Sequence, residues 1–123
     1  MTEPPAMETF PGPLPRFEPG QLVQHRRYGY RGVVVDFDLR CRAPESWYRK
    51  NRTQPERDQP WYHVLVDGST LVTYAAETSL EPDATQQPVH HPLVPHLFDA
   101  FAEGLYERNG EPWPGWDADD EAT

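Results

Sequence analysis

Basic and aromatic side chains alternate along one proline-bounded stretch of the chain, from Leu39 to Pro60. Cationic side chains neutralise the phosphates of nucleic acid, and aromatic rings stack on its bases. The basic residues of this stretch and of an adjoining turn are Arg26, Arg27, Arg31, Arg40, Arg42, Arg49, Lys50, Arg52 and Arg57. Together with the interleaved Trp47 and Tyr48, they form a candidate surface for nucleic acid. Either aromatic ring could also contact a methyl group in the major groove.

The same stretch allows a second interpretation. Residues Glu45 to Lys50 have the composition of a short helix that packs Trp47 on the protein and turns its charges toward water. The net charge of −9 favours this interpretation, because a duplex is itself an anion. The sequence leaves both interpretations open.

Neither catalysis nor metal binding is predicted. Nucleophilic catalysis needs an activated Ser, Cys or Thr with a base in reach, and no serine here lies in a glycine-flanked elbow. Cys41 has an arginine on each side, which favours the thiolate, but no partner base is identifiable. His90, His91 and His96 lack the spacing and the partners of a zinc site. We therefore expect no enzymatic activity, no metal and no cofactor.

Charge and cysteine usage suggest the class of protein. Residues 16–57 carry ten basic and five acidic residues, whereas the chain beyond Arg57 has one base and thirteen acids. The two halves should therefore attract different partners. No apolar run approaches the roughly 18 residues of a membrane helix, and the N-terminus lacks the pattern of a secretory signal. Because a single cysteine cannot form an internal disulfide, we expect a cytoplasmic protein with no membrane partner.

Windows free of proline mark where regular structure can form. The first predicts two strands, near residues 21–25 and 33–38, with Val33, Val35 and Phe37 on one face of the second. The next predicts a hairpin that turns at residues 67–69, followed by a short strand near Leu80. In the third, apolar residues recur at helical spacing: Val94, Leu97, Phe98, Phe101 and Leu105.

These elements predict a mainly β fold, a small antiparallel barrel with one C-terminal helix, over residues 16–109. Residues 1–15 form a proline-rich tail and residues 110–123 an acidic tail. We expect both tails to be disordered, because they have little apolar surface to bury. Two tryptophans of the acidic tail, Trp113 and Trp116, could nevertheless dock on the domain.

Three motifs, at residues Phe17–His25 with Tyr28–Asp38, Pro60–Val66 and Thr73–Leu80, carry a family resemblance. In order and spacing they resemble the YccV-like domain, the family of the bacterial heat-shock protein HspQ, which is labelled as hemimethylated-DNA-binding. Residues 41–47 and 89–92, with Phe98 and Phe101, look closer to the version found in a eukaryotic F-box protein. Short HspQ proteins differ here, because their corresponding loop is typically acidic.

The resemblance implies an SH3-like barrel without catalytic activity. It also implies two activities, which are binding of DNA methylated on one strand and regulation of a Lon-type protease. The residues that match the structural signature are Gly20, Gly29, Tyr30, Gly32, Asp38, Trp61, Tyr62 and Tyr74. We therefore predict a binding module that contacts double-stranded DNA through the basic loop. The alternative is a protein-interaction module, such as an adaptor or regulator of a Lon-type protease.

Overall fold

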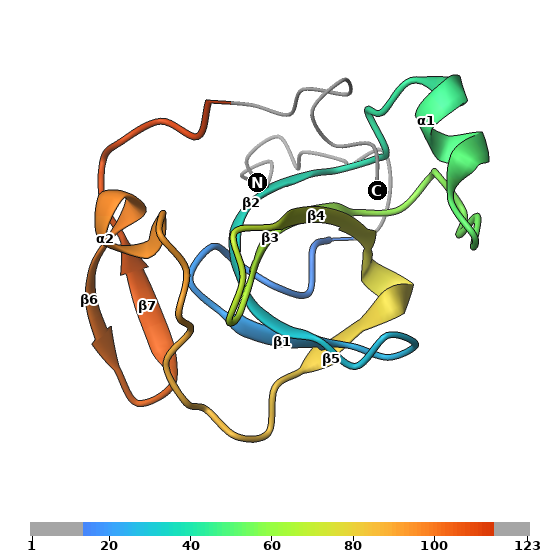
Figure 1. The fold of residues 1–123 in the computed structure, drawn as a ribbon. Helices are drawn as coiled ribbons and strands as arrows, with labels where there is room; N and C mark the ends of the chain where they lie inside the picture. The colour runs from blue at the N-terminus through green and yellow to red at the C-terminus, as the bar shows by residue number, and fades with distance from the viewer. Residues whose placement is uncertain (1–13, 115–123) are drawn as a thin grey trace, which may run out of the picture.

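The computed structural model of the protein describes residues 14–114 (Figure 1). The strands are β1 (Leu22–His25), β2 (Arg31–Asp38), β3 (Trp61–Val66), β4 (Val72–Ala76), β5 (Leu80–Pro82), β6 (Phe98–Ala102) and β7 (Leu105–Arg108). The helices are α1 (Glu45–Lys50), α2 (Val94–Leu97) and the 3-10 turn η1 (Glu77–Ser79). The predicted N-terminal tail and most of the acidic tail, including Trp116, lie outside the described residues.

The first five strands form one antiparallel sheet in the order β4-β3-β2-β1-β5. The sheet curls, and η1 joins its two edge strands, β4 and β5 (Figure 1). The prediction of a mainly β, SH3-like antiparallel barrel is confirmed, as is the hairpin between β3 and β4. Within the described part of the chain, no helix has the length and apolarity to cross a membrane, while the cytoplasmic location stays a prediction.

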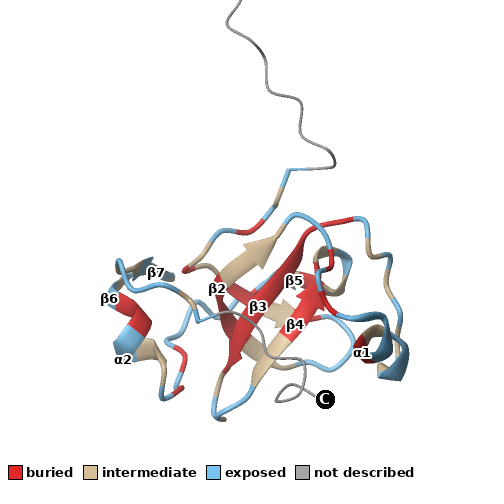
Figure 2. Ribbon diagram, turned by 90° about the horizontal axis from the view of Figure 1, so that it is seen from above, coloured by how far each residue is buried: buried red, intermediate tan, exposed pale blue. Residues whose placement is uncertain are grey.

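Side chains are buried on both faces of the central strands (Figure 2). All five strands contribute to the core inside the curl, which consists of Phe17, Val23, Val34, Tyr62, Val64, Ala75 and Leu80. On the outer face, one cluster lies beneath α2 and the β6–β7 hairpin, and consists of Leu22, Val33, Val35, Leu65, Val89, Leu97, Phe98 and Tyr106. The other lies beneath α1, and consists of Cys41, Ala43, Trp47, Trp61, Tyr74 and Ala76.

A β-bulge in β2 corrects one detail of the predicted alternation. The register between β2 and β3 shifts between Val34 and Asp36, so Val35 is an extra residue in the pairing. An extra residue moves every later side chain to the opposite face. Val33 and Val35 therefore face the β6–β7 hairpin, whereas Phe37 packs with Val34 on the inner core.

The predicted C-terminal helix is mostly wrong. Only Val94–Leu97 is helical, and the chain continues as the antiparallel hairpin of β6 and β7. The two-residue turn between Ala102 and Leu105 is the reason, because Glu103 and Gly104 both have positive φ values, 54° and 77°. Two consecutive left-handed residues are the geometry of a tight β-hairpin turn, which matches the twist of the flanking strands.

Polar contacts fasten this hairpin to the barrel. Arg108 donates from Nε to the carbonyl oxygen of Val35 at 3.1 Å and from Nη1 to that of Leu97 at 3.0 Å. Beyond the hairpin, the Trp113 ring lies 5.7 Å from that of His63, between centroids. Contacts of the described chain therefore extend past Asn109 to Trp113, while the domain boundary at Asn109 stays a prediction.

Gly20 lies where the hairpin meets the sheet. Its N–H donates to the carbonyl oxygen of Val34 at 2.7 Å, and its own carbonyl accepts from the N–H of Tyr106 at 2.9 Å. Its φ is +101°, and a Cβ added there would collide with the carbonyl of Tyr106. Gly29 has a similar φ of +77°, but a Cβ there would meet open space. A side chain at Gly20 would therefore meet both backbone strain and a steric collision, whereas a side chain at Gly29 would meet backbone strain alone.

We predict that Gly20→Ala lowers the free energy of unfolding by about 3 kcal/mol, since it adds a steric collision to the strain of a left-handed backbone. The matched control, Gly29→Ala, should cost about 1 kcal/mol, from backbone strain alone. Urea denaturation monitored by tryptophan fluorescence measures both values. Equal losses in the two variants would contradict the close approach of Tyr106.

Candidate nucleic-acid interface

The long connection between β2 and β3 folds around Trp47. This indole is only 6% exposed, and its ring centroid lies 6.3 Å from Trp61 and 5.8 Å from Tyr74. The hydroxyl of Tyr48 then donates to the carbonyl oxygens of Gln54 and Pro55 at 2.9 and 2.8 Å. The second interpretation of the sequence is therefore confirmed for the packing of Trp47, whose indole is buried against the barrel.

Neither the cysteine nor the histidines of the sequence form a reactive cluster. Cys41 is buried, and burial raises the pKa of its thiol, which favours the unreactive protonated form. Among residues 14–114, no three His, Cys, Asp or Glu side chains are grouped so as to hold a metal ion. His91 instead donates from Nε2 to the carbonyl oxygen of Leu71 at 3.0 Å and accepts at Nδ1 from the N–H of Leu93 at 3.1 Å.

Four cations of the predicted interface have ion pairs or hydrogen bonds with other groups of the protein. Arg31 donates to Asp83 at 2.9 Å and to Asp67 at 3.1 Å, and only 20% of its side chain is exposed. The other three are Arg26, which pairs with Glu81, Arg49, which pairs with Glu45, and Arg57, which bonds the carbonyl of Ala43. Arg31 and Arg57 thereby serve as internal ties rather than as free charges.

Lys50 and Arg52 are exposed and differ from these four, because neither side chain has an ion pair or hydrogen bond with residues 14–114. Arg40 and Arg42 are also exposed and lack a side-chain ion pair within the described range, although Arg42 lies near enough to Asp38 to lower its pKa. Arg27 is exposed too, with its guanidinium 5.9 Å from the ring centre of Tyr28. Three unpaired cations, Arg27, Lys50 and Arg52, therefore flank one region of the surface.

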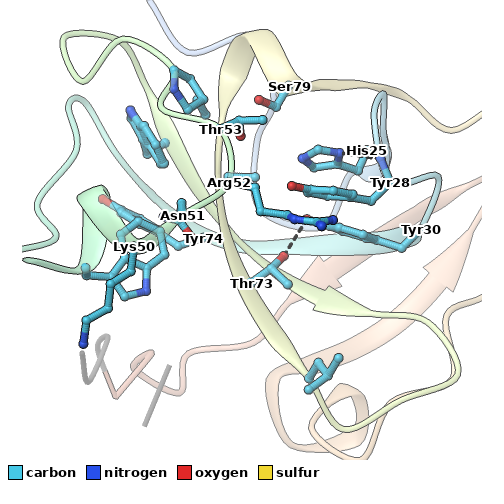
Figure 3. A pocket seen from close by; sticks show the side chains of 16 residues that line it. His25, Tyr28, Tyr30, Lys50, Asn51, Arg52, Thr53, Thr73, Tyr74 and Ser79 are labelled. Carbon is cyan, nitrogen blue, oxygen red and sulfur yellow. Dashed lines mark hydrogen bonds between the residues drawn. The ribbon is translucent and has the colours of Figure 1, made fainter. Parts of the chain in front are cut away.

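That region contains a pocket of about 360 Å³ that sequence reasoning missed (Figure 3). It lies between the β1–β2 turn, the edge strand β4 and the segment that follows α1. Its walls are mainly aromatic, from His25, Tyr28, Tyr30, Trp47, Trp61 and Tyr74. Lys50 and Arg52 also line it, and the side chain of Arg52 extends toward Tyr28 and Tyr30 (Figure 3). Among residues 14–114, no acidic side chain lines the pocket.

His25 fixes the shape of one wall. Its Nδ1 accepts hydrogen bonds from the backbone N–H groups of Arg27 at 3.2 Å and Tyr28 at 3.1 Å. The imidazole ring stacks on Tyr28, with centroids 4.7 Å apart. Burial, and secondarily the charge of Arg27, lowers the pKa of His25. The neutral ring with its proton on Nε2 is therefore the form that holds this turn.

The remaining signature residues position these parts. Tyr30 shares a 2.8 Å hydrogen bond with Thr73, which closes the pocket floor against β4 (Figure 3). Tyr74 donates to Asp38 at 2.6 Å and accepts from the N–H of Arg42 at 3.0 Å, which fastens the start of the long connection. The hydroxyl of Tyr62 donates to Glu77 at 2.7 Å and accepts from the N–H groups of Arg16 and Phe17. Gly32 brings β2 close to β3, since a Cβ there would lie 2.5 Å from the carbonyl oxygen of Leu65.

We predict that Arg31→Gln lowers the free energy of unfolding by about 3 kcal/mol at pH 7, because it leaves the buried carboxylate of Asp83 without its cation. Burial alone would raise the pKa of Asp83, but hydrogen bonds from Arg31 and Thr85 hold it below its ordinary value. A lowered pKa stabilises the fold above the unfolded value near 3.9, and this contribution is lost as pH falls through the folded pKa.

The stability difference between wild type and Arg31→Gln should therefore narrow below about pH 4. The matched control is Arg26→Gln, which breaks an exposed pair and should cost under about 0.5 kcal/mol. Thermal unfolding between pH 3 and pH 7 measures both effects. A loss in Arg31→Gln no larger than in Arg26→Gln would contradict the internal role of Arg31.

Comparison with known proteins assigns the family. A family model described as "Hemimethylated DNA-binding protein YccV like" matches residues 15–105. F-box only protein 21 from Homo sapiens and its counterparts from Pongo abelii and Mus musculus are each 35% identical to the chain over 96 residues. These matches cover 75% of this chain and 15% of each relative, so the chain corresponds to a small part of those proteins. Both resemblances inferred from the sequence are thereby confirmed, and the chain belongs to the YccV-like family.

Proposed function

We propose that this chain is a non-catalytic DNA-binding module whose contact surface surrounds the aromatic pocket. The family description, hemimethylated DNA-binding, supports a DNA-binding module in general. One observation carries the location of the surface. The unpaired cations Lys50 and Arg52 line a pocket with aromatic walls, and none of the described residues in its lining is acidic. Cations that bind phosphate, next to rings that stack on bases, are the chemistry of nucleic-acid recognition.

The contact surface has two cationic edges. Lys50 ends α1, Arg52 lies on the segment that follows, and Arg27 lies on the β1–β2 turn across the pocket. A second hollow beside the pocket is lined by Arg26, Arg27 and residues without a formal charge, such as Thr53, Gln54 and Ser79, and it continues the surface. Arg40 and Arg42 remain proposed contacts at the start of the long connection, whereas Arg31, Arg49 and Trp47 have partners within the protein.

Recognition of a methyl group is a finer part of the proposal. Trp47 is buried, and the Tyr48 hydroxyl is engaged by two backbone carbonyls, so neither ring is free to meet a duplex as an exposed group. Tyr28 is 48% exposed and offers the available aromatic surface beside the cations. We expect Tyr28 to be the ring that contacts a methylated base. Duplexes methylated on neither, one or both strands, compared at one salt concentration, test this expectation.

We predict a duplex affinity that falls with salt at a slope of about −2.7 in log K against log salt concentration. The slope follows from three phosphates neutralised by Arg27, Lys50 and Arg52, at about −0.9 for each. Fluorescence anisotropy of a labelled duplex, titrated between about 20 and 200 mM salt, measures it. A slope near zero would show that phosphate contacts do not drive binding.

Arg52→Gln should weaken duplex binding about tenfold, because it removes a cation that has no acidic partner among residues 14–114. Arg49→Gln is the matched control, since it lies three residues away and changes the net charge equally. Arg49 is already paired with Glu45 at 3.3 Å, so its loss should weaken binding less than about threefold. Equal effects of the two variants would indicate a diffuse attraction rather than a surface at the pocket.

The alternative prediction, an adaptor or regulator of a Lon-type protease, stays a prediction. A wild-type protein that fails to bind any duplex at about 20 mM salt would overturn the DNA-binding proposal, because phosphate contacts are strongest there. Binding to, or degradation by, a purified Lon-type protease would then test the alternative.

A further inference from the structure

We propose that the aromatic pocket receives a single unpaired nucleobase of a DNA strand, while Lys50 and Arg52 hold the adjoining phosphates. This inference rests on the proposed function and adds the position of the base. DNA binding through the cations alone would leave the pocket without a role. The pocket supplies the specific feature that a cationic surface lacks, which is a cavity with walls for a flat ring.

The size and walls of the pocket suit such a ring. Its volume of about 360 Å³ lies at the lower end of the range of small-molecule sites, roughly 300–1,000 Å³. His25, Tyr28 and Tyr30 gather on one side, and Tyr74 lies on the other (Figure 3). The ring of Trp61, which also lines the pocket, lies 5.3 Å from that of Tyr74 between centroids. Aromatic surfaces stack on any nucleobase, because every base has a π face.

The positive charge of the pocket argues against a cationic ligand, which aromatic walls often bind. Rings that surround a cavity also attract ammonium groups, through their negative faces. Here Lys50 and Arg52 add two positive charges, and no carboxylate of the described lining residues offsets them, so a cationic ligand is repelled. A flat neutral ring attached to an anionic backbone fits both features, because the ring can stack on the aromatic walls and the backbone can pair with Lys50 and Arg52.

The pocket also offers polar groups for the edge of a base. Because Nδ1 of the buried His25 accepts two backbone hydrogen bonds, Nε2 carries the proton, and it has no partner among residues 14–114. The hydroxyls of Thr53 and Ser79, which likewise have no side-chain partner within that range, line the same space (Figure 3). Donors and acceptors beside aromatic walls are what a nucleobase edge requires.

A pair of single-stranded probes separates base binding from phosphate binding. One is a fluorescein-labelled strand of twelve thymidine nucleotides, and the other is a strand of equal length and charge with abasic sites throughout. We expect wild-type protein to bind the thymidine strand about tenfold more tightly, since stacking contributes roughly 1–3 kcal/mol for each base. Fluorescence anisotropy at one salt concentration measures both affinities.

Tyr28→Ala should reduce the affinity for the thymidine strand to that for the abasic strand and leave the latter unchanged. The ring of Tyr28 is half-exposed, so its loss opens no buried core. Tyr28→Phe keeps the ring and should keep the preference. Arg52→Gln should instead weaken binding of both strands by a similar factor. Leu71→Asp, at an exposed position of the pocket lining, should also remove the preference, which provides a test should Tyr28→Ala not fold.

The outcomes distinguish this inference from the proposed function. Equal affinity of wild type for the two strands would overturn the nucleobase site and leave DNA binding through cations intact. A preference that survives both Tyr28→Ala and Leu71→Asp would place base binding elsewhere and overturn the inference as well. Failure of wild type to bind either strand or a duplex at about 20 mM salt would overturn both proposals.

Discussion

Burial of β3 on both faces is the constraint on which the rest of the structure depends. All six residues of this strand are buried. Tyr62 and Val64 point into the curl of the sheet, while Trp61 and Leu65 belong to the two clusters on its outer face. A small barrel cannot bury an outer face by itself, so other segments of the chain must cover it. The α1 segment covers the cluster at Trp61, and the β6–β7 hairpin covers the cluster at Leu65 (Figures 1 and 2).

The covering segments determine which cations remain available to a ligand. Arg31 holds the segment after β5 through Asp83, and Arg57 holds the start of the long connection through the carbonyl of Ala43. Arg108 does the same for the hairpin. Each of these guanidinium groups satisfies buried or half-buried acceptors, a use for which its fixed fork of donors is well suited. Lys50 and Arg52 have no such acceptors among the described residues. They line the pocket beside β4, where the covering segments leave the barrel open.

Strands were predictable from the sequence because alternation, β-branched residues and proline boundaries agree there. The C-terminal helix was not, since apolar residues such as Leu97, Phe98 and Phe101 fit a helix as well as a bulged hairpin. The pair Glu103–Gly104 forms the turn that makes this segment a hairpin. The pair is hard to recognise in the sequence, because glutamate is an unusual residue at positive φ. The pocket could not be predicted, because three segments far apart in the chain form it. The sequence also could not show which arginines form ion pairs, since Arg31 and Asp83 are far apart in the chain and meet only after it has folded.

Part of the negative net charge is separated in space from the proposed DNA-binding surface. Asp99, Glu103 and Glu107 are exposed on the β6–β7 hairpin, at the opposite end of the barrel from α1 in both views (Figures 1 and 2). Exposed charges are screened beyond about 8–10 Å at physiological salt. In the proposed complex, a phosphate beside Lys50 and Arg52 would respond mainly to the local cations, and the acidic hairpin would face away from the duplex. Net charge then sets the long-range repulsion at low salt, and the local arrangement of charges sets how the module is oriented when it binds.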